Sequence, residues 1–182
     1  MIAGLQIARP TYADLPAADK VFAASIRDAF EKEGLGNLQA EIGAEIRQKQ
    51  QLLRRALQPG ADVHFLVAIL QGRVVGTASA GPCNADIGQC TDQRLQDVIE
   101  LGSLYVLPEY QGQGVGSALI AAMLRQLQQS GIEQFCLDCG LRRAQQIWLH
   151  KFGAPYAVAR DYWGPGSDHL VWLCRVAEFL PN

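Results

Sequence analysis

Three glycines separated by single residues, G-Q-G-V-G at residues 112–116, constrain the fold of this chain more than any other feature. An apolar stretch at residues 99–107 precedes them and has the pattern of a strand that Pro108 stops. A helical pattern follows at once over residues 114–129, with apolar residues at four-residue steps. Glycine keeps side chains away from the backbone, and the first turn of a helix carries unpaired N–H groups and the positive end of the helix dipole. This strand–loop–helix unit therefore predicts an anion site, most naturally for a phosphate or diphosphate group.

Two familiar nucleotide-binding loops do not fit this segment. A dinucleotide-binding loop needs G-x-G-x-x-G after the first strand of its domain, but here the third glycine is missing and the loop lies beyond residue 100. A P-loop needs G-K-[ST], and no lysine follows these glycines. The anion site therefore belongs to another kind of fold.

Apolar patterns and turn residues divide the rest of the chain into alternating elements. Strands are expected at residues 4–10, 63–70, 74–80, 99–107, 133–139, 156–162 and 169–176. Helices are expected at residues 14–33, from a cap at Asn37 to a stop at Pro59, at 114–129 and at 142–151. The polar segment 82–96 is expected to be a loop with room for a short helix. The order β-α-α-β-β-β-α-β-α-β-β predicts an α+β (mixed α/β) fold, a single domain over residues 1–182 with a central mixed, mostly antiparallel sheet flanked by helices.

Composition restricts the class of protein further. Of the 182 residues, 49% are hydrophobic and 19% charged, and the formal net charge is -2, so the chain can build a core but offers no basic excess for nucleic acid or an anionic membrane. The apolar runs are far shorter than the ~20 residues of a membrane-spanning helix, and the N-terminus lacks the pattern of a secretory signal. Together with five cysteines, an odd number, these features predict a cytoplasmic protein with neither nucleic acid nor membrane as partner.

The cysteines do not have the pattern of a metal site. Cys136 and Cys139 have C-x-x-C spacing, but they lie in an expected strand, where residues three apart face opposite sides. A redox motif of this spacing would begin a helix instead. Cys83 and Cys90 have the wrong spacing to complete a structural zinc site. We therefore expect buried thiols and no bound metal.

The segment around the glycine loop resembles the GNAT superfamily of N-acetyltransferases. The family pattern Q/R-x-x-G-x-G/A is matched by Gln111, Gly114 and Gly116, after a strand reading L-Y-V-x-P and before S-A-L at the helix start. The order of the expected elements is similar to that family over nearly the whole chain. The resemblance implies an acetyl-CoA-dependent enzyme that transfers an acetyl group to a primary amine of a small molecule or protein by direct attack on the thioester. A non-catalytic acyl-CoA-binding regulatory module of the same fold and an unrelated phosphate-binding domain stay open as alternatives, and so does a homodimer.

The resemblance also implies a set of site residues. Backbone amides of the loop and first helical turn would bind the diphosphate of acetyl-CoA, and they belong to Gln111, Gly112, Gln113, Gly114, Val115, Gly116 and Ser117. Val106 and its strand neighbours would pair with the pantetheine arm as an added strand does. The amide of Leu104 would polarise the acetyl carbonyl, as an oxyanion-hole donor does. The thioester would lie where the strands that carry Glu100 and Glu133 part.

Glu100 is the candidate general base, because an alkylammonium group must lose a proton before it attacks. Strand alternation is expected to place Glu100, Gly102, Leu104 and Val106 on one face. Glu100 would then lie about 13 Å of backbone from Leu104 and would act through a water molecule. A solvated carboxylate at the end of a strand is the competing interpretation.

The general acid of the family pattern is missing. Many members carry N-x-x-A-x-x-x-Y in the later helix, with the tyrosine facing the sulfur of CoA. Here Ala144 matches, but Leu141 replaces the asparagine and Trp148 the tyrosine, and an indole does not supply a proton usefully. His150 and Lys151 are expected to be exposed helix residues.

Two segments bear on the acceptor. Asp86, Asp92 and Asp97 in the polar loop, with Glu100, would form an acidic wall for a cationic amine, or else the loop is simply solvated. The W-G-P-G-S-D-H turn at residues 163–169 either shapes the lip of a pocket or caps a β-hairpin.

Overall fold

The computed structural model describes residues 2–180, and these form one mixed sheet. Its strands are β1 (Gln6–Ala8), β2 (His64–Leu70), β3 (Arg73–Pro82), β4 (Ile99–Val106), β5 (Gln134–Cys139), β6 (Ala157–Ala159) and β7 (His169–Arg175). Their order in the sheet is β1-β2-β3-β4-β5-β7-β6. Neighbouring strands are antiparallel except β4 and β5, which are parallel. The mixed, mostly antiparallel sheet expected from the sequence is confirmed.

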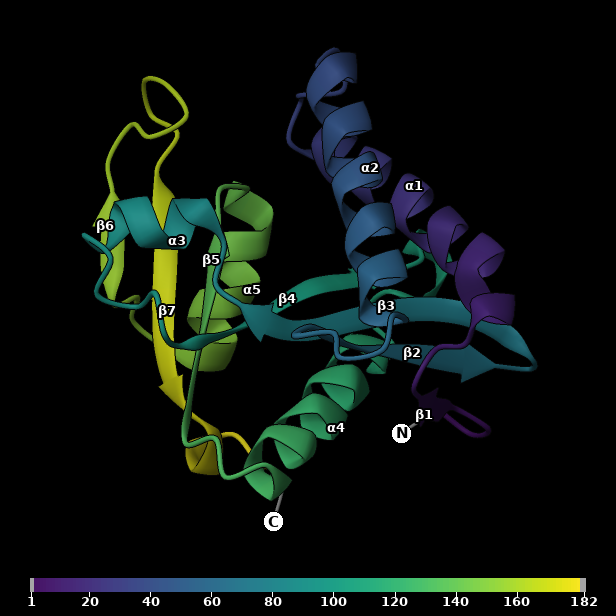
Figure 1. Cartoon of the computed structure of the whole chain (residues 1–182). Coiled ribbons are helices and arrows are strands. Elements are labelled where there is room, and N and C mark those ends of the chain that lie inside the picture. Colours follow the sequence, from purple (N-terminus) through teal and green to yellow (C-terminus); the bar gives the residue numbers. More distant parts are fainter. Residues whose placement is uncertain (1, 181–182) are drawn as a thin grey trace.

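Helices cover both faces of this sheet. They are α1 (Leu15–Lys32), α2 (Gln39–Ala56), α3 (Ala85–Cys90), α4 (Val115–Gln129) and α5 (Arg142–Phe152), with short 3-10 turns η1 (Tyr12–Asp14), η2 (Pro108–Tyr110) and η3 (Val176–Glu178). Figure 1 shows α1 and α2 on one side of the β1–β4 half and α4 on the other. Within residues 2–180, no helix combines the length and apolarity needed to cross a bilayer.

The apolar stripe of α4 anchors the first half of the sheet. Val115, Leu119, Met123 and Leu127, which recur at four-residue steps, are all buried. Gly76 on β3 lets this helix approach closely, because a Cβ atom there would lie 3.1 Å from Leu119 Cδ1. Each buried side chain of this size contributes roughly 1.5–3 kcal/mol.

The second half of the sheet is covered separately on its two faces. A small cluster built on Ile87, Leu95, Cys136 and Val171 lies under α3, whereas Phe135 belongs to the main core. The short helix α3 thus occupies the polar loop, as the sequence allowed.

The expected strand at residues 156–162 is shorter in the structure, where β6 ends at Ala159. Asp168 explains the difference, because its carboxylate accepts the N–H of Asp161 at 3.0 Å and pairs with Arg160 at 2.9 Å. Because of these side-chain bonds, the chain leaves its pairing with β7 after Ala159 and enters the turn.

A β-bulge interrupts β4. Ser79 of β3 pairs with Gly102, whereas Thr77 pairs with Tyr105, so β4 has one residue more than β3 in this interval. Ser103 lies at the bulge with φ of 46°, a left-handed conformation uncommon for residues other than glycine.

This bulge overturns the expectation that Glu100, Gly102, Leu104 and Val106 share one face. Val106 pairs with Gly76, which faces α4, and directly paired residues share a face. Gly102 pairs three residues further along β3, so Gly102 and Glu100 face the opposite side, where α1 and α2 lie. The extra residue shifts the alternation by one position.

Substitutions at Ser103 test the bulge. Ser103→Val should lower the free energy of unfolding by roughly 1–2 kcal/mol, because a β-branched residue is strained at positive φ. Ser103→Gly should unfold at the same denaturant concentration as the parent or higher. Equal stability of the two variants in urea unfolding would contradict the bulge.

Candidate active site

The strands β4 and β5 are paired only where they begin. Ile99 pairs with Phe135 and Glu100 with Cys136, and beyond these pairs β4 continues beside β3 while β5 continues beside β7. Figure 1 shows the two halves of the sheet diverging from this point. The later part of β4 therefore has an edge that is not covered by β5.

Backbone groups of Leu104 and Val106 lie on this uncovered edge. The N–H of Leu107 donates to the carbonyl of Val75 at 2.9 Å, toward β3. Alternation then directs the N–H and C=O groups of Val106 and Leu104 the other way. The carbonyl of Val106 accepts a hydrogen bond from Ser25 Oγ at 2.9 Å, so one acceptor on the edge is already engaged.

Two glycines of the loop, Gly112 and Gly114, have a backbone conformation that other residues rarely adopt. Gly112 and Gly114 have φ of 71° and 90°, and a Cβ atom at either would have no heavy atom within 4 Å. Glycine is required there for positive φ, and the space above the loop is open. Gly116 lies within α4, where a Cβ atom would be 3.9 Å from Val106 Cγ2, an ordinary contact.

The first turn of α4 presents unpaired donors. Gly114 is the N-cap and has no side chain to supply a capping bond, and the first intrahelical bond runs from Ala118 N to Gly114 O at 3.0 Å. The N–H groups of Val115, Gly116 and Ser117 therefore have no partner within the helix. The first turn carries no acidic residue, so its positive end is available to an anion.

Two lysines that sequence reasoning did not assign lie beside this loop. Lys151 Nζ is 3.4 Å from Ser117 Oγ, and Lys32 Nζ is 3.3 Å from Gln111 Oε1. The side chain of Gln111 also donates to the carbonyl of Val106 at 3.1 Å, which ties the loop to β4. From helix periodicity, Lys151 was expected to be merely an exposed residue. Its approach to α4 depends on how α5 packs, which periodicity does not show.

Glu100 lies half-buried on the α1–α2 side of β4. Its Oε2 accepts the backbone N–H of Asn84 at 2.8 Å. Burial, and then the negative charge of Asp138, raise the pKa of Glu100 to about 7, against the opposing effects of Lys49 and Asn84. The surroundings of Glu100 thus differ from those of a fully solvated strand end. They bring the pKa of its carboxyl group close to neutral pH, where a general base works best.

Aromatic residues of the site do not offer an easily released proton. Trp148 stacks on Phe152 with ring centroids 5.7 Å apart. Tyr105 donates its hydroxyl to Glu45 at 2.9 Å, and burial raises its pKa well above the ordinary value. Tyr162 donates to a carboxylate of α3, and this bond raises its pKa to about 12.

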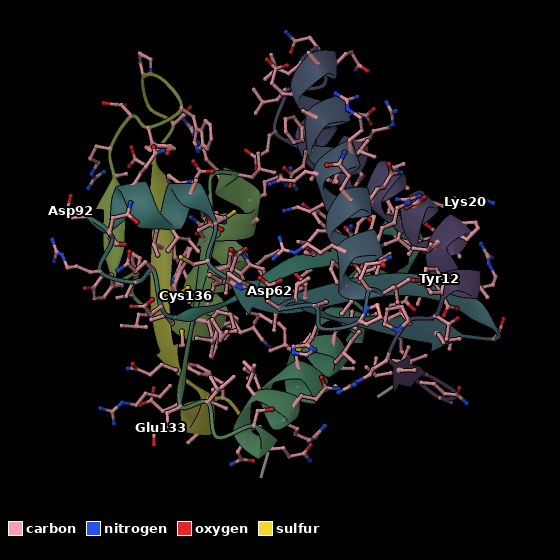
Figure 2. All side chains as sticks on the ribbon, viewed as in Figure 1. Tyr12, Lys20, Asp62, Asp92, Glu133 and Cys136 are labelled. Atoms are coloured by element: carbon pink, nitrogen blue, oxygen red, sulfur yellow. The ribbon has the colours of Figure 1, made fainter. Side chains whose placement is uncertain are left out.

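The cysteines are neutral thiols. Burial raises the pKa of every one: Cys83, Cys90, Cys136, Cys139 and Cys174. Figure 2 marks Cys136 on β5, next to the parting of the sheet. Because the thiolate is the nucleophilic form, these residues are poorly suited to carry an acyl group. Over residues 2–180, His, Cys, Asp and Glu form no group of three or more that could hold a metal ion.

The aspartates of the polar loop do not act as one wall. Asp92 lies at the outer edge of the molecule in Figure 2 and pairs with Arg94 at 2.8 Å, and Asp97 is also exposed. Asp86 alone of the three contacts the C-terminal turn, where it accepts the hydroxyl of Tyr162 at 2.7 Å.

The uncovered edge of β4 leads to the N-terminus of α4, which no side chain caps, and this arrangement suits a ligand with an extended arm and a diphosphate group. Residues 24–154 match the family model described as acetyltransferase (GNAT) family. The chain belongs to this family. It is an acetyltransferase, as the resemblance of the glycine loop and its flanking residues implies.

Three solved structures show the same fold. A putative acetyltransferase of the GNAT family from Desulfovibrio desulfuricans is 21% identical, with a TM-score of 0.71 over 94% of this chain and 99% of that one. The PaiA N-acetyltransferase from Thermoplasma acidophilum, solved with coenzyme A, is 19% identical, with a TM-score of 0.68 over 94% and 98%. The ribosomal-protein-S18-alanine N-acetyltransferase from Escherichia coli is 18% identical, with a TM-score of 0.64 over 94% of each chain.

The raised pKa of Glu100 predicts a pH-dependent stability. The folded-state pKa of about 7 exceeds the ordinary value of 4.5, so the contribution of Glu100 is fully present below pH 4.5 and is lost as pH rises through 7. From about pH 5 to pH 8, the parent should lose roughly 1–3 kcal/mol of unfolding free energy relative to Glu100→Gln. Urea unfolding at the two pH values measures this, and parallel losses in both proteins would contradict it.

Proposed function

We propose that this chain is an acetyl-CoA-dependent N-acetyltransferase acting on a primary amine of a small molecule or a protein, with residues 1–182 as one catalytic domain. The observation that carries the proposal is the unpaired first turn of α4 beside the uncovered edge of β4. The fold shared with an N-acetyltransferase that was solved with coenzyme A supports it.

The residues present fit acetyl-CoA. The diphosphate binds to the N–H groups of residues 112–117, whereas the N–H of Gln111 is already donated to the carbonyl of Pro108 at 3.2 Å. The ammonium group of Lys151 adds positive charge beside the loop, and Lys32 lies next to it in an ion pair with Asp28 at 2.6 Å. The pantetheine arm pairs with the edge of β4, mainly through N–H groups, since the carbonyl of Val106 is engaged by Ser25. The N–H of Leu104 donates to the thioester carbonyl and stabilises the negative charge that develops there.

Transfer is direct. Glu100, through a water molecule, takes a proton from the acceptor ammonium, and the free amine attacks the thioester carbon. The new C–N bond forms, the C–S bond breaks, and CoA leaves as a thiolate, while the second proton of the attacking nitrogen passes to that thiolate or to solvent. The neutral cysteines favour this route over an acyl-cysteine intermediate, and a thiolate leaving group needs no dedicated acid in the place of Trp148.

The bulge of β4 determines the direction of approach. Glu100 faces the α1–α2 side, whereas the Leu104 amide lies on the edge between the two sheet halves. The acceptor amine therefore approaches from the α1–α2 side and meets the carbonyl at the edge.

The five unpaired cysteines are compatible with the reducing cytoplasm that we expect as the location.

Release of CoA thiol over a panel of amines tests the proposal. The panel comprises amine antibiotics, polyamines, amino acids, and peptides with a free N-terminus or lysine. We expect steady turnover with one of these classes. Retention on a CoA matrix without thiol release from any member would instead favour a non-catalytic module.

Gly114→Val should weaken CoA binding by roughly tenfold to a hundredfold, the value of one or two hydrogen bonds to a charged group. The side chain enters the open space above the loop and strains a residue with φ of 90°. Gly131→Val is the matched control, because Gly131 follows the other end of α4 with φ of 73° and equally open surroundings. Calorimetric titration with CoA should show weaker binding only for Gly114→Val. Equal affinities of the two variants for CoA would contradict the proposal that the loop binds the diphosphate.

Glu100→Gln should lower the rate by roughly 10²–10⁴-fold near pH 7, the usual contribution of a general base. Acetyl-CoA binding should hardly change, because the carboxylate lies on the acceptor side. The two rates should converge at high pH, where the free amine needs less help. A fixed deficit at every pH would mean that Glu100 binds the cationic acceptor, and full activity throughout would exclude it as base.

A further inference from the structure

Asn84 connects the carboxylates of Glu100 and Asp138. Glu100 pairs with Cys136 across the two strands, and Asp138 lies two residues further along β5, so both carboxylates are on one face. The backbone N–H of Asn84 donates to Glu100 Oε2 at 2.8 Å, and its side-chain Nδ2 donates to Asp138 Oδ2 at 3.1 Å. Asn84 is itself fixed as the N-cap of α3, because its Oδ1 accepts the N–H of Ile87 at 2.9 Å.

His169 holds the same oxygen of Asp138 from the other side. Its Nε2 lies 2.9 Å from Asp138 Oδ2, and its Nδ1 lies 3.0 Å from the indole Nε1 of Trp163. An indole N–H only donates, so Nδ1 is the acceptor and the ring proton is on Nε2, which donates to Asp138. His169 as a whole is 4% exposed, so this contact is shielded from solvent. Asp138 Oδ2 therefore accepts hydrogen bonds from both Asn84 and His169.

Charged and titratable groups reach Glu100 from three elements. Asp138 and Cys136 face it from β5, Cys83 from the segment before α3, and Lys49 from α2. The ammonium of Lys49 is 3.2 Å from Glu45 Oε1, so its positive charge is partly neutralised by its own partner. Asp138 has no cationic partner in the network described above, and it is the strongest negative influence on Glu100.

We propose that Asp138 is a positioning residue whose charge, held in place by Asn84 and His169, sets the pH range in which Glu100 accepts the amine proton. This inference rests on the proposed function of Glu100. Two carboxylates on one face oppose each other's ionisation, so Glu100 keeps its proton to higher pH and is a stronger base once it is ionised. Asp138 acts through Glu100 and needs no contact with either substrate.

The variant Asp138→Asn tests this inference, because the amide oxygen still accepts from His169 and Asn84 while the charge is lost. The acidic limb of the kcat/KM profile should move by roughly one pH unit toward lower pH, the effect of a nearby like charge in a partly buried site. Asp138→Ser, which is also neutral, should give a shift in the same direction. Thermal unfolding establishes that each variant is folded.

Control variants separate the possible outcomes. Asp92→Asn also removes one negative charge, but from the exposed pair with Arg94, and should leave the acidic limb in place. In the Glu100→Gln background, Asp138→Asn should have no further effect on the limb. An unmoved limb in both folded Asp138 variants, or loss of activity at every pH, would overturn the inference while a slow Glu100→Gln variant still upholds the general base. Full activity of Glu100→Gln would overturn the proposed function itself.

Discussion

The pairing of β4 with β5 ends after Glu100 and Cys136, and the whole site depends on this early parting. Two parallel strands that stayed paired would satisfy each other's backbone groups and leave no edge for a ligand. Because they part, β4 keeps the N–H of Leu104 on an uncovered edge that leads directly into the glycine loop and α4. The helices α3 and α5 can then cover the second half of the sheet separately, each on its own face.

Positive groups lie at the loop end of β4, and carboxylates lie near the point where β4 and β5 part. At the loop, the positive end of α4 and the ammonium group of Lys151 suit an anionic ligand, whereas the charge of Lys32 is partly neutralised by Asp28 at 2.6 Å. On the α1–α2 side of β4, Glu100 and Asp138 place two carboxylates near one another. In the proposed function, the separation of the two regions along β4 keeps the diphosphate away from the carboxylates, so that neither charge cancels the effect of the other.

Most elements of this fold follow from local patterns, and the errors occur where distant residues intervene. The helix at residues 114–129 and its glycine loop were predicted almost to the residue, because periodicity and positive φ are local properties. The prediction that Leu104 and Glu100 face the same side of the sheet was wrong. One extra residue at Ser103 reverses the alternation of the strand, and no pattern in its sequence indicates this bulge. Strand β6 was predicted too long, because Asp168 bonds to the turn from outside the strand.

The sequence by itself determined the glycine loop, the helix that follows it and the family, and it named the candidate base, because these depend on residue types at short spacing. Only the tertiary structure decided what surrounds the base. Asn84 and Asp138 are 54 residues apart, and His169 lies further still along the chain, so only strand register and the packing of α3 bring them to Glu100. Burial and charge fix the behaviour of a carboxylate, and both are properties of the neighbours that folding provides.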